Sequence, residues 1–420
     1  MNILVLGSGA REHSICWSLK KSCDCDQIYC SPGNAGISEV AICILIGKHK
    51  KDLLAFCKKN KINLVVIGPE ELLSHGISDF LLKNNINVFG PTKNAAKLET
   101  SKSFAKSFLK KNNISTPKYV RFSSYQKGYN YLKIANYPLV VKADGLAAGK
   151  GVVICHNTKE GLNSINLIMK KKKFGDAGKS IIIEEFIEGF ELSYFAFFDK
   201  KSYLPLGYAL DHKKAYDNDK GPNTGGMGCF TPSEKVTKSL LEKIKTQILD
   251  KTFNGIKKEN FDYRGILFFG LIIKNDKPSV IEYNVRFGDP ECQTLLRNLK
   301  TDLLKIFIAT SKDNLRKIKI KKSTNSTVCI VLASKGYPEN YKKNIIIKNL
   351  SNIKKNKSIE IFHAGTIKKE GNFYSNGGRV LSITCSEKNI SSARKLAYKM
   401  LQKINWDAGF YRKDIGFKNN

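Results

Sequence analysis

The stretch from Val140 to Val152 limits the folds open to this chain more than any other. Its sequence, VVKADGLAAGKGV, joins two β-branched runs through a loop that is rich in glycine and flanked by two lysines. β-Branched residues favour strands, and glycine allows positive φ and close approach of the backbone to a bound group. The pattern therefore predicts a strand, a flexible loop and a second strand. Lysines beside such a loop suit a group that carries several phosphates.

The loop is not a Walker A motif. That motif ends in Gly-Lys-Ser or Gly-Lys-Thr and opens a helix. Here the spacing from Gly145 to Gly149 is one residue too short, and Lys150 is followed by Gly151. An isolated glycine loop is more often an ordinary connection between two strands. The alternative is a loop that covers phosphates as a lid, and the rest of the chain decides between the two.

The first hundred residues alternate between predicted strands and helices, which indicates a parallel sheet. Ligands bind such sheets at the carboxyl ends of the strands, where this chain places glycine turns. The first turn contains Gly9 and Arg11, but Glu12 occupies the third glycine position of a dinucleotide motif. This argues against nicotinamide or flavin. Two alternatives stay open: an anion at the start of the first helix, or a tight turn only. The expected strands are 3–6, 28–30, 64–67 and 88–89.

Acidic residues follow the strand predicted at 181–183. They form the sequence EEFIEGFE at 184–191. A strand edge with free backbone groups, an apolar ring and nearby carboxylates suits an adenine and its ribose. Acidic residues are, however, usually solvated surface, so this signal is weak by itself. The segment 204–230, which is rich in glycine and contains Asp211, Lys213 and Asn223, is expected to be a long loop, and long loops in compact domains are usually functional.

A predicted hairpin at 265–284 carries candidate metal ligands on its second strand. The two-residue period of a strand places Glu282 and Asn284 on one face, with Arg286 just beyond. Carboxylate and amide oxygens are ligands that Mg²⁺ takes beside phosphates. The plain alternative is a polar-faced edge strand. No acidic residue lies on the preceding strand, Gly265–Ile273, so the number of metal ions stays open.

The charge of +34 suggests a nucleic-acid partner, but its distribution argues against one. Lysine supplies most of the excess and is dispersed over the chain, whereas nucleic-acid sites gather basic residues on one face with aromatic platforms. A positive field does favour anionic small substrates. No apolar run is long enough for a membrane span, the N-terminus does not resemble a signal peptide, and the cysteines show no disulfide or zinc spacing. We therefore expect a cytoplasmic protein.

Together, these motifs resemble the ATP-grasp superfamily and, within it, the phosphoribosylamine–glycine ligase family. The resemblance covers essentially the whole chain. It implies an α/β protein with a parallel-sheet (pre-ATP-grasp) N-terminal domain, an ATP-grasp fold with a glycine-loop lid, and a small C-terminal α/β domain. The motifs are GSGxREH at 7–13, PGNAG at 32–36, GPE at 68–70, GPT at 90–92, the glycine loop, DHK at 211–213, GPNTGGMG at 221–228, EYNVRFGDPE at 282–291, GYP at 336–338, HAGT at 363–366, NGGRV at 376–380 and RKDIG at 412–416.

The resemblance also implies domain limits and an activity. The substrate-binding N-terminal domain would span 1–101, the ATP-grasp domain 102–320 with its lid at about 118–190, and the C-terminal domain 325–420. The implied reaction joins glycine to 5-phosphoribosylamine through glycyl phosphate, with hydrolysis of ATP to ADP and phosphate, in de novo purine synthesis. The implied cofactors are ATP and Mg²⁺, with Mn²⁺ as an alternative metal. We expect a monomer with no nucleic-acid or membrane partner.

Site residues follow from the same resemblance. Arg286, Asp211 and Lys213 are the candidate catalytic residues, and Glu282 and Asn284 the candidate metal ligands. Substrate contacts are assigned to Gly9, Arg11, Asp211, Lys213, Asn223 and Arg286. Nucleotide contacts are assigned to Lys102, Lys142, Gly145, Gly149, Lys150, Gly151, Glu184, Glu185, Phe186, Ile187, Glu188 and Glu191.

Three rival functions fit parts of the sequence. Another ATP-grasp carboxylate–amine ligase, or a biotin-dependent carboxylase subunit, would share the lid and the hairpin but not the 211–228 segment or the C-terminal motifs. A nucleic-acid-binding protein would need clustered basic residues. An inactive relative would lack charged motif residues, and this chain retains every one that is expected.

Overall fold

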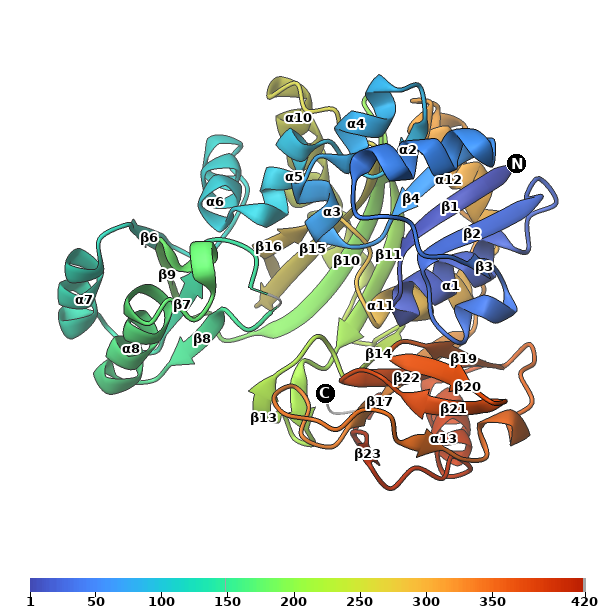
Figure 1. Cartoon of the computed structure of the whole chain (residues 1–420). Coiled ribbons are helices and arrows are strands. Elements are labelled where there is room, and N and C mark those ends of the chain that lie inside the picture. Colours follow the sequence, from blue (N-terminus) through green and yellow to red (C-terminus); the bar gives the residue numbers. More distant parts are fainter. Residues whose placement is uncertain (148, 418–420) are drawn as a thin grey trace.

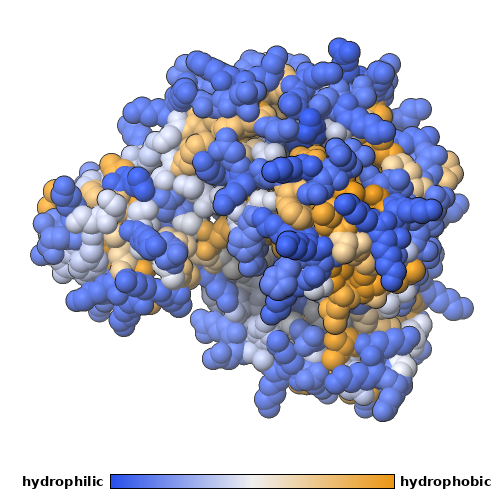
Figure 2. All heavy atoms as spheres, turned by 45° about the horizontal axis from the view of Figure 1, so that its top comes forward, coloured by the Kyte–Doolittle hydropathy of each residue, from blue (hydrophilic) through white to orange (hydrophobic). Residues whose placement is uncertain are grey.

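The structure, a computed structural model, describes residues 1–147 and 149–417; Ala148 of the glycine loop and residues 418–420 of the predicted C-terminal domain lie outside them. The N-terminal and C-terminal parts flank a long central sheet, and a smaller lobe, drawn in teal and green, stands to one side (Figure 1). Hydrophilic side chains cover most of the surface in the view of Figure 2, and a hollow separates the smaller lobe from the C-terminal part.

The N-terminal part is a parallel sheet covered by helices, as predicted. Its strand order is β3-β2-β1-β4-β5. Each predicted strand is present. The two-residue strand β3 forms one edge of the sheet and was not predicted from the sequence. The strands are β1 (Asn2–Gly7), β2 (Gln27–Pro32), β3 (Ile42–Cys43), β4 (Ile62–Ile67) and β5 (Asn87–Phe89). The helices are α1 (Ala10–Leu19), η1 (Ile37–Glu39), α2 (Lys50–Lys59), α3 (Glu70–Ser74), α4 (Ile77–Lys83) and α5 (Lys93–Thr100).

The central sheet is antiparallel and continues into the C-terminal part. Its order is β16-β15-β10-β11-β14-β17-β22-β19, with β23 beside β17. The C-terminal strands thus extend the central sheet through the pairing of β14 with β17. The strands are β10 (Phe190–Phe198), β11 (Tyr203–Asp211), β14 (Gly228–Thr231), β15 (Gly265–Lys274), β16 (Lys277–Asn284), β17 (Ser326–Ser334), β19 (Ile359–His363), β22 (Arg379–Glu387) and β23 (Gly409–Phe410).

Helices and short strands complete this body. A three-stranded sheet, β18-β21-β20, packs in the C-terminal part. Its strands are β18 (Ile346–Ile347), β20 (Thr366–Lys369) and β21 (Asn372–Ser375). The helices and helical turns are α6 (Lys102–Lys111), α9 (Lys238–Ile244), η4 (Lys245–Leu249), α10 (Asp250–Lys258), α11 (Glu291–Asn298), α12 (Leu303–Ser311), η5 (Leu315–Lys317), η6 (Leu350–Asn352) and α13 (Ile390–Leu401).

The smaller lobe is the predicted lid. It has its own four-stranded sheet, β6-β9-β7-β8, and a separate apolar core that includes Val141, Ile165 and Ile183. The predicted strand–loop–strand of the glycine stretch is confirmed, because β7 pairs directly with β8. The lid elements are β6 (Tyr119–Phe122), α7 (Tyr125–Ile134), β7 (Leu139–Ala143), β8 (Val152–Cys155), α8 (Thr158–Ile165), η2 (Asn166–Lys170), η3 (Gly175–Gly178) and β9 (Ile181–Glu185).

The expectation of a long loop over 204–230 is wrong. Strand β11 runs through Asp211, and the hairpin of β12 (Lys214–Tyr216) and β13 (Lys220–Asn223) follows it before β14. Asn218 and Asp219 both have positive φ at the hairpin tip, a conformation that Asn and Asp tolerate and that matches the twist of a tight hairpin. The glycines and acidic residues therefore mark turns between short strands.

Candidate active site

A cavity of about 1510 Å³ lies where the N-terminal part, the lid and the central sheet meet. Pockets for one small molecule are usually about 300–1,000 Å³, so this cavity has room for more than one. Two predicted contacts, Gly145 and Glu188, do not line it. The predicted residues that line it are Gly9, Arg11, Lys102, Lys142, Gly149, Lys150, Gly151, Glu184, Glu185, Phe186, Ile187, Glu191, Asp211, Lys213, Asn223, Glu282, Asn284 and Arg286.

Buried lysines stand at the lid side of the cavity. The Nζ atom of Lys142, on β7, donates to Glu184 Oε2, on β9, at 2.9 Å, and Lys106 Nζ lies 3.1 Å from the same oxygen. Burial lowers the pKa of Lys106 to about 8, against the opposing effect of Glu184. Lys102 Nζ donates to the carbonyl of Gly145 at 3.1 Å. This arrangement concentrates positive charge where a polyphosphate would lie.

Sequence analysis missed Lys106, although a signal existed. Lys106 follows Lys102 by four residues on α6, and residues with that spacing share one face of a helix. Lysines are usually exposed, so the pattern alone did not set Lys106 apart. The structure shows it 98% buried because Glu184 supplies the opposite charge and the hydroxyl of Thr116 accepts a hydrogen bond at 2.6 Å.

The glycine loop contacts the C-terminal part. Lys150 Nζ donates to the carbonyl of Pro338 at 3.1 Å, which uses one of its three donors and ties the loop to the C-terminal part. Gly149 has a φ of +72°, which favours glycine at this position. A Cβ at Gly151 would lie 2.6 Å from that of Ala147, so the tight return of the loop also requires glycine there.

The candidate adenine site lies at the end of β9. Glu184 is 98% buried, and its Oε1 has no hydrogen-bond partner among the described residues. The side chain of Glu185 accepts a hydrogen bond from the backbone of Lys118, and the ring of Phe186 is partly exposed. Strand β9 ends at Glu185, which leaves the following backbone groups outside the sheet. A purine base could use these backbone groups and the free carboxylate oxygen.

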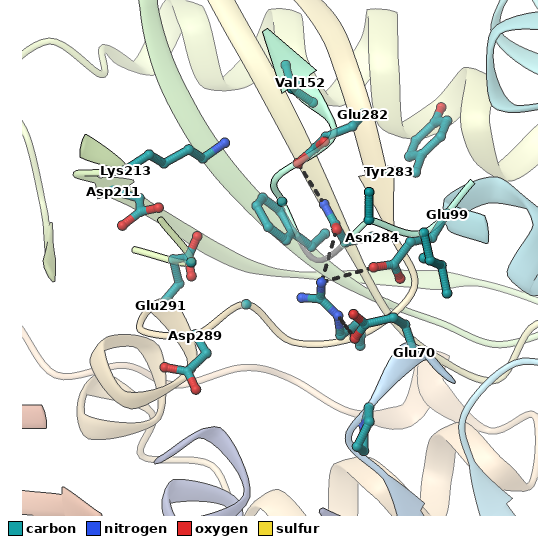
Figure 3. A pocket seen from close by; sticks show the side chains of 18 of the residues that line it. Glu70, Glu99, Val152, Asp211, Lys213, Glu282, Tyr283, Asn284, Asp289 and Glu291 are labelled. Atoms are coloured by element: carbon teal, nitrogen blue, oxygen red, sulfur yellow. Dashed lines mark hydrogen bonds and ion pairs between the residues drawn. The ribbon is translucent and has the colours of Figure 1, made fainter. Parts of the chain in front are cut away.

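The hairpin of β15 and β16 holds the candidate metal ligands. Burial would raise the pKa of Glu282, but Lys213, Lys142 and Lys102 outweigh it and hold that pKa at about 2, so the side chain is a carboxylate. Asn284 donates to Glu282 Oε1 at 3.2 Å, and its own oxygen accepts from Arg286 (Figure 3). A metal held by both residues would require that amide oxygen.

The donor set fits Mg²⁺. The described residues contain no cluster of three His, Cys, Asp or Glu side chains that could enclose a metal by itself. Mg²⁺ keeps several waters and is usually bound through one or two carboxylates together with substrate phosphates, so two oxygen ligands on one hairpin suffice.

Arg286 connects this hairpin to the N-terminal part. Its Nε donates to Glu70 Oε2 at 2.7 Å, and its Nη2 lies 3.0 Å from Glu99 Oε1. Glu99 also accepts from the backbone of Val285 at 2.8 Å. Burial raises the pKa of Glu99 to about 7, against the opposing charge of Arg286. Sequence analysis missed Glu99, because a glutamate at the end of an amphipathic helix is normally a solvent-facing residue.

The opposite side of the cavity carries several carboxylates. Asp211, Asp289 and Glu291 all line it, and Figure 3 shows their side chains on the side away from Glu70 and Glu99. Arg379, from the C-terminal part, lies 3.3 Å from Asp289. Lys213 pairs with Glu191 at 3.0 Å. Asp289, Glu291 and Arg379 belong to motifs quoted above, but only their place in the fold assigns them to the cavity.

The predicted substrate contacts at the first turn are engaged within the chain. Gly9 N donates to Glu12 Oε2 at 2.7 Å. Arg11 Nε donates to Glu12 Oε1 at 2.6 Å, and its Nη1 donates to the carbonyl of Phe287 at 3.2 Å. These bonds engage the N–H of Gly9 and two of the five N–H donors of Arg11. Contact between this turn and substrate stays a prediction.

A cavity of this kind, with lysines from α6 and β7 on one side and candidate metal ligands on the hairpin of β15 and β16, is typical of an ATP-grasp enzyme, and the family model of the ATP-grasp (A) domain matches this part of the chain. The fold agrees. Biotin carboxylase from Campylobacter jejuni is similar to this chain with a TM-score of 0.76, at 14% sequence identity, over 99% of this chain and 94% of that one. At this identity, the likeness concerns the fold alone.

Comparison with known proteins identifies the particular family. Models of the phosphoribosylglycinamide synthetase N domain, ATP-grasp (A) domain and C domain match residues 1–99, 100–292 and 327–418. A phosphoribosylamine–glycine ligase from Caldanaerobacter subterraneus is 42% identical over 416 residues, which cover 99% of each protein. The chain belongs to this family, also called the phosphoribosylamine–glycine ligases, and is a carbon–nitrogen ligase of the ATP-grasp class.

Two further relatives agree with this assignment. The chloroplastic phosphoribosylamine–glycine ligase of Arabidopsis thaliana is 43% identical over 416 residues, which cover 97% of this chain and 78% of that protein. The crystal structure of phosphoribosylamine–glycine ligase from Thermotoga maritima has a TM-score of 0.85 and 33% identity, over 99% of this chain and all of that one. Within the described residues, no helix has the length and apolar character to cross a membrane.

Proposed function

We propose that this chain ligates glycine to 5-phosphoribosylamine, forming glycinamide ribonucleotide, ADP and phosphate in purine biosynthesis. The proposal rests on the family membership, which extends along the whole chain. The cavity supports it, because lysines, candidate metal ligands and further carboxylates line the same space. The cofactors are ATP and Mg²⁺, with Mn²⁺ as an alternative metal. The monomeric state, the cytoplasmic location and the domain limits stay predictions.

ATP lies between the lid and the central sheet in this proposal. Lys142 and Lys102 contact its phosphates, and the backbone from Glu185 to Ile187 borders its adenine. Glu191, which lines the cavity, is better placed for the ribose than Glu188, which does not. Glu282 and Asn284 would hold Mg²⁺, which neutralises phosphate charge when it is bound.

The first step activates glycine. A carboxylate oxygen of glycine attacks the γ-phosphorus of ATP, a new P–O bond forms, the bond to ADP breaks, and glycyl phosphate results. Arg286 faces the charge that develops on the transferred group, and Glu70 and Glu99 fix its guanidinium in advance. Fixed charges that require no reorganisation are an effective source of transition-state stabilisation.

The second step forms the amide. The amine of phosphoribosylamine attacks the acyl carbon of glycyl phosphate. The new C–N bond forms, the C–O bond to phosphate breaks, and one amine proton passes to the departing phosphate. Because the substrate supplies the nucleophile in both steps, the enzyme needs no covalent nucleophile of its own. Its contribution is positioning and charge neutralisation.

The test is release of ADP with each substrate omitted in turn. The proposal predicts sustained ADP release only when ATP, Mg²⁺, glycine and chemically generated phosphoribosylamine are all present. Sustained glycine-dependent release without phosphoribosylamine, or no release with the full mixture, would contradict it.

A further inference from the structure

Two carboxylates in the cavity lack a cationic partner. Asp211 ends β11, and Glu291 begins α11. No side-chain nitrogen of a described lysine, arginine or histidine lies within 4.0 Å of either carboxylate. Glu291 is 97% buried and accepts from Ser193 Oγ at 2.9 Å. The buried Oδ1 of Asp211 has no hydrogen-bond partner among the described residues.

The nearby cations already have partners. Lys213 pairs with Glu191, and Arg379 pairs with Asp289 while its Nη1 also donates to the carbonyl of Gly225 at 2.9 Å. Burial raises the pKa of both Asp211 and Glu291, and the lowering effect of Lys213 does not offset this cost of burying charge, because no cationic side chain of the described residues is in direct contact with either carboxylate. A cationic ligand would remove that cost.

We propose that Asp211 and Glu291 bind the ammonium group of glycine. The inference rests on the proposed function and deepens it. A primary ammonium offers three N–H donors, which match the free oxygen of Asp211 and the carboxylate of Glu291. Figure 3 shows both carboxylates across the cavity from Asn284 and Glu99. Arg286 contacts both of these residues, and the glycine carboxylate would react on that side. Glycine carries opposite charges at its two ends, and in this assignment its ammonium faces the two carboxylates while its carboxylate faces Arg286 and the metal that the hairpin of β15 and β16 would hold.

This assignment makes the pair a determinant of specificity. Glycolate has the carboxylate and size of glycine but a hydroxyl in place of the ammonium. A site that binds a charged group through buried acceptors discriminates strongly against an analogue without it, because the acceptors are then left unpaired. The wild-type enzyme should therefore activate glycine and reject glycolate.

The experiment compares wild type, Glu291→Gln and Asp211→Asn in ADP release. Each substitution keeps the size of the side chain and removes its charge. Both variants should raise the KM for glycine about 30- to 100-fold, leave the KM for phosphoribosylamine within threefold, and reduce the preference for glycine over glycolate by a similar factor. Glu242→Gln, on the exposed face of α9, is the control and should change none of these.

The outcomes separate the alternatives. A higher KM for phosphoribosylamine with an unchanged KM for glycine would assign the pair to the other amine and overturn the proposal, as would a fall in kcat with both KM values unchanged. If neither variant folds, the wild-type enzyme supplies the test: methylammonium should compete with glycine, and failure to compete would overturn the proposal. Failure of the proposed function itself would appear earlier, as no glycine-dependent ADP release by wild type.

Discussion

Lys142 Nζ lies 2.9 Å from Glu184 Oε2, and the two residues stand on the adjacent strands β7 and β9 of the lid. Lys106 approaches the same oxygen to 3.1 Å, so one buried carboxylate holds two buried ammonium groups. Lys142, the lysine proposed to contact the ATP phosphates, is therefore held in place by the lid sheet without a bound nucleotide. Its positive charge is only partly compensated, which favours an incoming polyanion.

Glu184→Gln should destabilise the protein by about 3 kcal/mol, because removal of one partner from a buried ion pair leaves charge without compensation. The measurement is urea unfolding at neutral pH. Glu242→Gln, which removes one partner of the exposed pair with Lys245, is the matched control and should cost less than about 1 kcal/mol. Equal losses in the two variants would show that Glu184 does not support the lysines.

Glu282→Ala should abolish turnover and leave the protein folded. Its carboxylate is ionised at every working pH because three lysines hold its pKa at about 2, and in this account it binds the metal that accompanies ATP. ADP release at saturating Mg²⁺ and an unfolding curve for the same sample test both parts. Retained turnover would show that the metal ligand is misassigned.

Arg286→Lys should lower kcat about 100-fold. Lysine cannot reproduce the planar guanidinium that contacts Glu70 and Glu99 together, so the positive charge is no longer fixed beside the transferred phosphoryl group. The control is Arg264→Lys, since Arg264 makes a comparable double contact with Asp313 away from the cavity. Steady-state kinetics of the two variants decide the matter: an equal effect on kcat would assign Arg286 a structural role only.

Acid should destabilise the protein between pH 6.5 and about 4. Burial lowers the pKa of His212 to about 4 and of His363 to about 3, so the unfolded state binds protons in this interval that the folded state does not. The contribution of each histidine to the free energy of unfolding is therefore fully present above pH 6.5. As pH falls below 6.5, this contribution is lost by about 1.4 kcal/mol per pH unit for each histidine. His363→Asn should reduce the slope of unfolding free energy against pH by that amount. The exposed His156→Asn is the control and should leave this slope unchanged. Equal slopes in the two variants would contradict the prediction.

Local patterns in the sequence predicted the elements that carry the chemistry. The β-branched runs around the glycine loop specified β7 and β8, and the two-residue period placed Glu282 and Asn284 together on β16. Repeated strand and helix segments predicted the parallel N-terminal sheet. These features depend on near neighbours in the chain, so a single sequence contains them.

Long-range contacts were not predictable in this way. Glu99 reaches Arg286 across 187 positions of sequence, and no local pattern distinguishes it from a surface glutamate. The connection of the C-terminal motifs to the cavity is visible only in the fold. There, Tyr337 and Arg379 line the cavity, and the carbonyl of Pro338 accepts a hydrogen bond from Lys150. The turn at Asn218 and Asp219 was mistaken for part of a long loop, because glycine and acidic residues also mark loops.

The central claim is best tested with glycine that carries ¹⁸O in both carboxylate oxygens, together with ATP, Mg²⁺ and phosphoribosylamine. The account predicts glycinamide ribonucleotide with one labelled oxygen and inorganic phosphate with the other, because the acyl phosphate leaves with one glycine oxygen. Mass spectrometry of both products gives the answer. Absence of the ribonucleotide would contradict the assigned reaction, and phosphate without label would contradict activation through glycyl phosphate.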